Sequence, residues 1–157
     1  MAELALTEAE RSFLVALQEL GVRYMVVGLT AAVMQGADTL TADIDLWFAD
    51  RNDPNIHEAA RRAGGIWIPG SFGMMPPMIG GDTLGDRFDV VLTLSGLEDF
   101  SIESQTAKTI DVDGLALPVL PLERIIHSKR AAGRPKDQAV LPALEAALAA
   151  VRDAEGG

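Results

Sequence analysis

Several features are missing from this sequence of 157 residues. It has no cysteine, which excludes disulfide bonds and thiolate metal sites. It has no apolar run of the roughly 18 residues that a membrane-spanning helix needs. Residues 1–4 lack the basic and apolar regions of a signal peptide. These absences predict a cytoplasmic protein with no membrane segment.

Basic residues are also scarce. The chain has 13 Lys and Arg against 23 Asp and Glu, which gives a net charge of −10 with histidine neutral. Because nucleic-acid backbones are bound by clustered Lys and Arg, this balance excludes a passive nucleic-acid binder. Any contact with nucleic acid would need a local basic patch.

The composition and periodicity of the chain indicate a folded α/β (α+β) protein. Apolar residues make up 48% of it, enough for a sizeable core, and its length suits one domain. The predicted helices cover about 7–20, 30–35, 52–64 and 121–133. The predicted strands cover 22–27, 41–48, 88–94, 109–112 and 115–120. A last helix is expected to restart at Pro142, because proline breaks an interior turn, and the Gly- and Pro-rich segment 69–86 is expected to be loop or a short hairpin.

Two aspartates, Asp43 and Asp45, lie in the second predicted strand. Side chains at positions i and i+2 of a strand point to the same face, so these carboxylates would stand side by side. Carboxylates held so close repel each other unless a cation lies between them. Mg²⁺ takes such oxygen ligands and usually shares its site with phosphates. The pair therefore indicates metal-assisted phosphate chemistry, although an Asp-x-Asp on a half-exposed strand is an equally simple interpretation of these two residues alone.

A glycine turn and a third acid extend this pattern. The first predicted strand ends at Gly28, and Leu29 and Thr30 lead directly into a helix. Free amide groups at such a turn bind phosphate, and glycine lets the backbone approach closely. Asp89 begins a later strand segment, on the face opposite its apolar residues. If these strands are neighbours, Asp89 is either a further metal ligand or a general base for an incoming hydroxyl.

The order and spacing of these motifs resemble the nucleotidyltransferase superfamily of the polymerase-β type. That superfamily has an apolar residue, Gly, then Gly or Ser, a helix and an Asp-x-Asp, and this chain has Val27-Gly28-Leu29 followed by Asp43-Ile44-Asp45. The segments 122–126, 128–130 and 134–137 are similar to those of small bacterial members of the AbiEii-like, toxin–antitoxin-associated kind. The resemblance extends from about residue 22 to residue 144.

The resemblance implies a nucleotidyltransferase fold: a small mixed sheet with helices mainly on one face and an open acidic cleft. It implies one domain, with a core at about 22–120 and a helical part at about 121–153. It also implies Mg²⁺-dependent transfer of a nucleoside monophosphate from an NTP to a hydroxyl of a protein, an RNA end or a small molecule. The implied catalytic and metal-binding residues are Asp43, Asp45 and Asp89. The implied nucleotide-binding residues are Gly28, Leu29, Thr30, Lys129 and Lys136.

Two positions depart from the superfamily pattern. Leu29 stands where Gly or Ser is usual, and Thr39 stands where close relatives often have Arg. Both departures would weaken phosphate binding. They support an alternative in which the fold serves as a weakly active or inactive binding module, such as an antitoxin-like partner of another protein.

A basic cluster near the C-terminus has two interpretations. Lys129, Arg130, Arg134 and Lys136 are concentrated in an otherwise acidic chain. They would either face the acids and hold a triphosphate or an RNA end, or complement a helix C-terminus and pair with Asp137. The sequence leaves both open.

Overall fold

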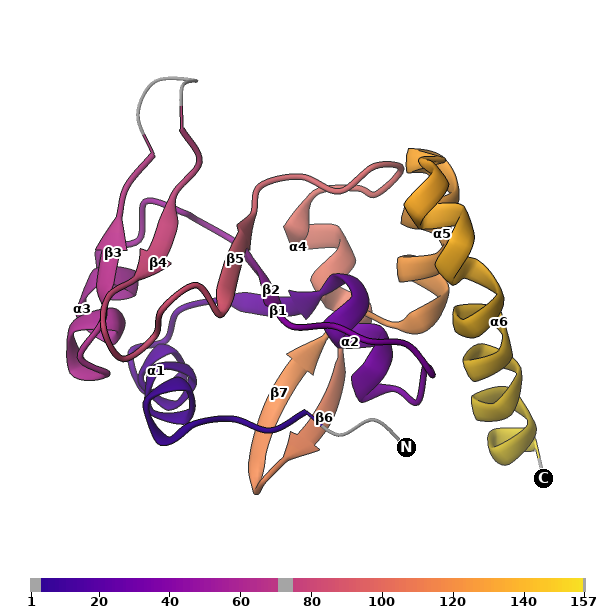
Figure 1. Cartoon of the computed structure of the whole chain (residues 1–157), viewed down its shortest axis with the longest axis horizontal. Helices are drawn as coiled ribbons and strands as arrows, with labels where there is room; N and C mark the ends of the chain where they lie inside the picture. The colour runs from indigo at the N-terminus through magenta and orange to yellow at the C-terminus, as the bar shows by residue number, and fades with distance from the viewer. Residues whose placement is uncertain (1–3, 71–74, 157) are drawn as a thin grey trace.

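The computed structural model describes residues 4–70 and 75–156 and contains helices and a mixed sheet (Figure 1). The helices are α1 Glu8–Glu19, α2 Gly28–Met34, α3 Pro54–Arg62, α4 Phe100–Glu103, α5 Leu122–Ala132 and α6 Pro135–Gly156, with a 3-10 turn at Ser104–Thr106. The strands are β1 Tyr24–Val27, β2 Ile44–Phe48, β3 Ile66–Ile68, β4 Met78–Gly80, β5 Phe88–Val91, β6 Lys108–Val112 and β7 Leu115–Val119. Within the described ranges, no helix is long and apolar enough to cross a membrane.

The main sheet has five strands in the order β5-β2-β1-β7-β6. β1 runs antiparallel to β2, β2 runs parallel to β5, and β1 runs parallel to β7. β6 and β7, which correspond to the predicted strands 109–112 and 115–120, form an antiparallel hairpin that turns at Asp113-Gly114. The expected mixed sheet is therefore confirmed, and it places β2 between β1 and β5.

Alternation along β2 separates the core from the site. Ile44, Leu46 and Phe48 are buried on the face that α1 covers, and Asp45 and Trp47 lie on the other face. Phe13 of α1 packs on Phe88 of β5 with ring centroids 5.0 Å apart. α3 packs beside α1, and its Ile56 is fully buried. The acid-bearing face of β2 is thus the one that α1 and α3 leave open.

The first helix forms as its sequence predicts. The Thr7 hydroxyl accepts the Glu10 N–H at 3.1 Å, and the Glu10 carboxylate accepts the Thr7 N–H at 2.9 Å, which completes a capping box. Phe13, Leu14 and Leu17 are fully buried at helical spacing. The amphipathic pattern therefore fixes which face of α1 meets the sheet.

The structure differs from the sequence prediction at several elements. Strands β3 and β4 form a separate antiparallel pair that partly overlaps segment 69–86, of which residues 71–74 lie outside the described residues. β5 ends at Val91, three residues before the predicted end of the strand at residue 94, and Leu92 beyond it is exposed. Helix α4 was not predicted, because its single turn is too short for a periodic pattern.

The expected restart of the last helix at Pro142 is wrong. Helix α6 runs without interruption from Pro135 to Gly156 with Pro142 inside it. Its packing against α5, together with the burial of Leu144 and Ala147, offsets the hydrogen bond that proline cannot donate. Tertiary contacts have overridden the local preference here.

Replacing the interior proline should stabilise the protein. Pro142→Ala restores a backbone donor in α6 and should raise the free energy of unfolding by about 1–3 kcal/mol, measured by urea denaturation. Pro135→Ala is the matched control: the first helical position has no intrahelical partner for its N–H, so stability should change by less than about 0.5 kcal/mol. A Pro142→Ala protein no more stable than the parent would contradict this account of α6.

Candidate active site

Three acids lie close together on the open face of the sheet. Asp45 of β2 is in register with Asp89 of the parallel neighbour β5. Asp43 lies just before β2, which begins at Ile44, one residue later than an Asp43-containing strand would require. Asp45 is partly buried, whereas Asp43 and Asp89 are exposed. The strands that carry the acids are therefore neighbours, as the sequence hypothesis required.

The Asp45 carboxylate lies against the backbone of Gly28. Val27, the last residue of β1, pairs with Asp45, so the chain turns into α2 directly beside this side chain. Gly28 has a φ of +67°, which is in the left-handed region, and a Cβ at this position would lie 2.2 Å from Asp45 Oδ2. No other residue type fits both the conformation and the space. The glycine turn is thus built around one of the acids.

Hydrogen bonds fix the segment that carries Asp43. The hydroxyls of Thr30 and Thr41 both donate to the Asp43 carbonyl, the latter at 3.2 Å. Arg87 donates from a terminal guanidinium nitrogen to the Ala42 carbonyl at 2.9 Å. Thr30 is fully buried, so in this structure its hydroxyl positions Asp43 and does not face the cavity. Leu29, the other expected phosphate contact in this turn, packs partly buried against the core.

The acids alter each other's ionisation. Burial, then the charge of Asp89, raises the pKa of Asp45 to about 6, and the nearby Lys129 ammonium acts in the opposite direction. Burial, the Asp43 charge and a hydrogen bond with the Asp43 carboxyl raise the pKa of Asp89. The site therefore holds negative charge that lacks full compensation.

Two cations of the basic cluster lie across from Gly28. Lys129 of α5 and Arg134, which precedes α6, line a cavity of about 330 Å³ together with Gly28 and Ser128. Both cations bond to Asp137, which is 1% exposed: Lys129 Nζ lies 3.3 Å from Asp137 Oδ1, and Arg134 Nε lies 2.7 Å from Asp137 Oδ2. Arg134 first, with Lys129, holds the pKa of Asp137 at about 2. A buried anion thus fixes two cations at the cavity wall.

The other two cations of the cluster are placed differently. Lys136 is exposed in the first turn of α6 and does not line the cavity. Arg130 pairs with Glu145 on α6. The expected pairing with Asp137 is therefore present for Lys129 and Arg134, which also line the cavity beside Gly28, and binding of a triphosphate by these cations stays a prediction. Sequence reasoning treated Asp137 only as an ion-pair partner and gave no sign of its burial.

The acids could bind a divalent cation, although they are not arranged as a complete set of metal ligands. Across residues 4–70 and 75–156, no three His, Asp or Glu side chains are grouped tightly enough to constitute a metal centre. The acids are instead paired, with Asp89 facing Asp45 in register and sharing a hydrogen bond with Asp43. Carboxylate oxygens with raised pKa values are a donor set that Mg²⁺ would suit, because the ion would relieve their repulsion.

This chain has the nucleotidyltransferase fold, as its structural neighbours show. Its five-stranded sheet and the glycine turn against Asp45 are parts of that fold. The antibiotic-resistance factor ANT(2'')-Ia has this architecture in its solution structure, with a TM-score of 0.57 and 15% identity over 94% of this chain and 91% of that one. A crystal structure of ANT(2'')-Ia in complex with adenylyl-2''-tobramycin gives a TM-score of 0.56 and 15% identity, over 92% and 95% of the two chains.

An antigenic nucleotidyltransferase-like protein from Paracoccidioides brasiliensis is also similar, with a TM-score of 0.54 and 17% identity over 87% of this chain and 74% of that one. No family model and no curated protein matches the chain. Structural neighbours at these identities share the fold of this chain, and they leave the roles of its acids to be tested directly.

The contact between Gly28 and Asp45 can be tested by a double-mutant cycle. Gly28→Ala should destabilise the protein by roughly 2–3 kcal/mol, from left-handed strain and from collision with the carboxylate. In an Asp45→Ala background the collision is absent, and the same change should cost only about 1 kcal/mol. Gly21→Ala is the control, because Gly21 has a φ of +72° with nothing within 4 Å of a Cβ. Equal costs of Gly28→Ala in both backgrounds, measured by urea denaturation, would show that the contact is not made.

The raised pKa of Asp45 predicts a pH-dependent stability difference in the metal-free protein. The folded pKa of about 6 lies above the usual value, so the folded state binds this proton more tightly and loses stability as pH rises from about 4 to about 6. Asp45→Asn removes the charge, and its stability advantage over the parent should grow across that window to roughly 1–3 kcal/mol. Thermal denaturation in EDTA from pH 4 to 8 measures it. A stability advantage of Asp45→Asn that does not change with pH would contradict the raised pKa of Asp45.

Proposed function

We propose that the protein is a Mg²⁺-dependent nucleotidyltransferase that transfers a nucleoside monophosphate from an NTP to a hydroxyl acceptor. The observation that carries the proposal is the placement of Asp45 against Gly28, with Asp89 beside it and Lys129 across the adjoining cavity. This geometry puts carboxylates and cations on two sides of one glycine turn, which supports assigning the carboxylates as metal ligands and the cations as phosphate ligands. Each set alone has simpler explanations, and their meeting at Gly28 is what favours nucleotide chemistry.

The residues divide the chemistry between them. Asp43 and Asp45, with Asp89, would hold Mg²⁺, which when bound supplies charge neutralisation for the triphosphate. Lys129 and Arg134 would bind the β- and γ-phosphates, and Asp137 keeps both cations in place. The glycine turn lets the phosphates approach the backbone closely.

In the proposed transfer step, one bond to the α-phosphorus forms, one breaks, and a side chain of the site takes the proton. The acceptor oxygen forms a bond to the α-phosphorus, and the bond from that phosphorus to the oxygen bridging to the β-phosphate breaks. Pyrophosphate leaves against Lys129 and Arg134. Asp89, which lies in register beside Asp45, would accept the hydroxyl proton as the general base.

A similar solved structure and the net charge of the chain both limit the range of candidate acceptors. ANT(2'')-Ia was solved with adenylyl-2''-tobramycin, a nucleotidylated small molecule. A net charge of −10 opposes binding of an RNA backbone away from a local basic patch. Both observations favour a small hydroxyl compound over an RNA end, and a protein hydroxyl is the remaining possibility.

A second candidate function follows from two departures from the superfamily pattern. Leu29 offers no hydroxyl and packs against the core, and Thr39 stands where similar proteins often have an arginine. A protein that binds nucleotide weakly through this fold would serve as a regulatory module, for instance an antitoxin-like partner of another protein. The retained acids oppose this alternative, because clustered carboxylates are costly without a cation.

Nucleotide binding separates the two functions. Calorimetry with ATP, GTP, CTP and UTP in the presence of Mg²⁺ should detect binding of at least one, and Asp43→Ala should weaken it by at least 10-fold through loss of a metal ligand. Asp153→Ala removes an exposed acid on α6 and should leave binding unchanged. Labelled NTP with Mg²⁺ should also release pyrophosphate once an acceptor is supplied.

Unchanged binding in Asp43→Ala would overturn the assignment of the acids as metal ligands. Absence of NTP binding by the parent protein, together with tight association with another protein, would favour the binding module. The same titrations are repeated without Mg²⁺. NTP binding of equal affinity with and without Mg²⁺ would contradict the assignment of the acids as metal ligands.

A further inference from the structure

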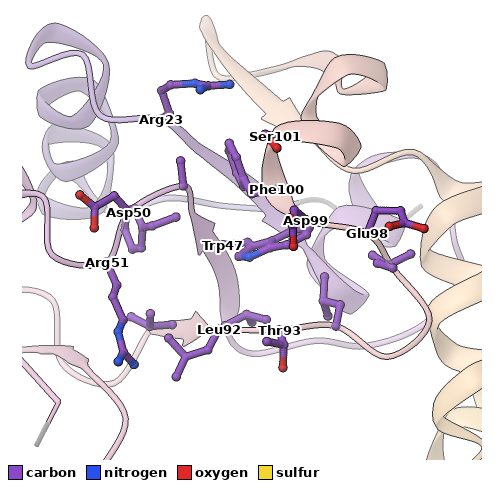
Figure 2. Close-up of a pocket in the computed structure, with 16 residues that line it drawn as sticks. Arg23, Trp47, Asp50, Arg51, Leu92, Thr93, Glu98, Asp99, Phe100 and Ser101 are labelled. Atoms are coloured by element: carbon purple, nitrogen blue, oxygen red, sulfur yellow. The ribbon is translucent and has the colours of Figure 1, made fainter. Parts of the chain in front are cut away.

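A second cavity lies next to the acids, and most of its lining takes no part in the proposed nucleotide site. It has a volume of about 840 Å³, and Figure 2 shows the side chains that line it. We propose that this cavity is the acceptor site and that it takes a small, hydroxyl-bearing organic cation. The proposal rests on the nucleotidyl transfer proposed above and adds the location and the chemical class of the acceptor.

The position of the cavity follows from the register of two strands. Trp47 lies two residues beyond Asp45 on β2, and Val91 lies two residues beyond Asp89 on β5, so both belong to the face that carries the acids. Two residues of a strand span roughly 7 Å. Thr93 and Leu94 line this cavity and also the one that holds Gly28 and Lys129. A molecule in the large cavity is therefore adjacent to a nucleotide bound at Gly28.

The lining has the character of a small-molecule site. Partly buried or exposed apolar residues of β5 and the following loop, including Val91, Leu92 and Leu97, form one part of it. Trp47 and Phe100 meet edge to face with centroids 5.4 Å apart and form another. A volume in this range suits a drug-sized ligand, which binds through apolar surface and a few polar groups.

Acidic residues outnumber basic ones in the lining. Asp50, Glu98 and Asp99 line the cavity, all exposed, together with two arginines, Arg23 and Arg51. In Figure 2 Arg51 lies beside Asp50, whereas Glu98 and Asp99 lie on the other side with no labelled arginine next to them. These carboxylates would repel the phosphates of an RNA end and attract amino groups. The Arg23 guanidinium lies over the Phe100 ring, 5.6 Å from its centroid, so the aromatic wall already carries a cation of this chain, and the attraction for an amino group of a ligand comes from Glu98 and Asp99.

The loop that carries two of these carboxylates is held in place. Glu103 is 4% exposed and accepts the Glu98 backbone N–H at 2.9 Å. Its carboxylate also binds Arg124 of α5 through two hydrogen bonds, at 2.9 Å and 2.8 Å. Gly96 packs so closely on α5 that a Cβ would lie 2.7 Å from the Ala131 side chain. Glu98 and Asp99 are therefore presented by a rigid loop, as pre-organised recognition requires.

The chain has two tryptophans, so Trp67→Phe leaves Trp47 as the single fluorescent reporter inside the cavity. The probes are tobramycin, which carries hydroxyls and amines, sucrose, which carries hydroxyls without charge, and a 12-nucleotide single-stranded RNA. In the Trp67→Phe protein, tobramycin should change Trp47 emission in a saturable way, and sucrose and RNA should not.

Neutralising the rigid loop should abolish most of this binding. Glu98→Gln with Asp99→Asn should weaken tobramycin binding at least 10-fold and leave Mg²⁺–NTP binding within 2-fold. Asp153→Asn with Glu155→Gln makes the same change in net charge on exposed α6 positions and should leave both unchanged.

The outcomes separate this inference from the proposed function. Absence of Mg²⁺–NTP binding by the parent protein with intact tobramycin binding would overturn nucleotidyl transfer and leave the cavity as a binding site for a cation without a role as acceptor site. Normal NTP binding with no response of Trp47 to tobramycin would overturn the acceptor site, as would binding that survives the Glu98→Gln, Asp99→Asn double change. A response of Trp47 to the RNA at least as strong as that to tobramycin would overturn the chemical class.

Discussion

The site depends on the contact between a strand carboxylate and a glycine backbone. Asp45 can occupy its place on β2 only because residue 28 has no side chain, and Gly28 can turn into α2 only because it adopts a left-handed φ of +67°. The contact joins the end of β1 to the middle of the acid cluster. It also faces the cavity that holds Lys129, so one point in the fold sets the distance between the acidic and the basic halves of the site.

Opposite charges are kept apart on the two sides of this point. Asp43, Asp45 and Asp89 carry negative charge with raised pKa values at two positions. Lys129 lies near these acids but is hydrogen-bonded to Asp137, which keeps it from forming an ion pair with them. Because of this separation, the negative charge of the three acids is not fully neutralised. Lys129 and Arg134 share the single carboxylate of Asp137, so the positive charge at the cavity is not fully neutralised either. A metal–nucleotide complex supplies a cation to the acids and an anion to the cavity, which is the physical basis of the proposed function.

Sequence reasoning succeeded where local pattern decides structure. The alternation around Asp43 and Asp45 and the capping box at Thr7 and Glu10 predicted β2 and α1. It failed where distant contacts decide, because packing keeps Pro142 inside α6. It also gave no sign that Thr30 is buried and donates to the Asp43 carbonyl. Burial of Asp137 and the cavity beside Trp47 depend on elements far apart in the chain, and no local pattern encodes them. A period of two predicted Asp45 on the open face of β2, whereas Asp43 lies before the strand and the pairing of Asp45 with Asp89 depends on a neighbouring strand.

A structure of the protein with a non-hydrolysable NTP analogue and Mg²⁺ tests the central claim most directly. We predict density for the metal between Asp43 and Asp45, with the triphosphate passing Gly28 and ending against Lys129. A triphosphate bound elsewhere, or a nucleotide at Gly28 with the metal away from both aspartates, would contradict the account.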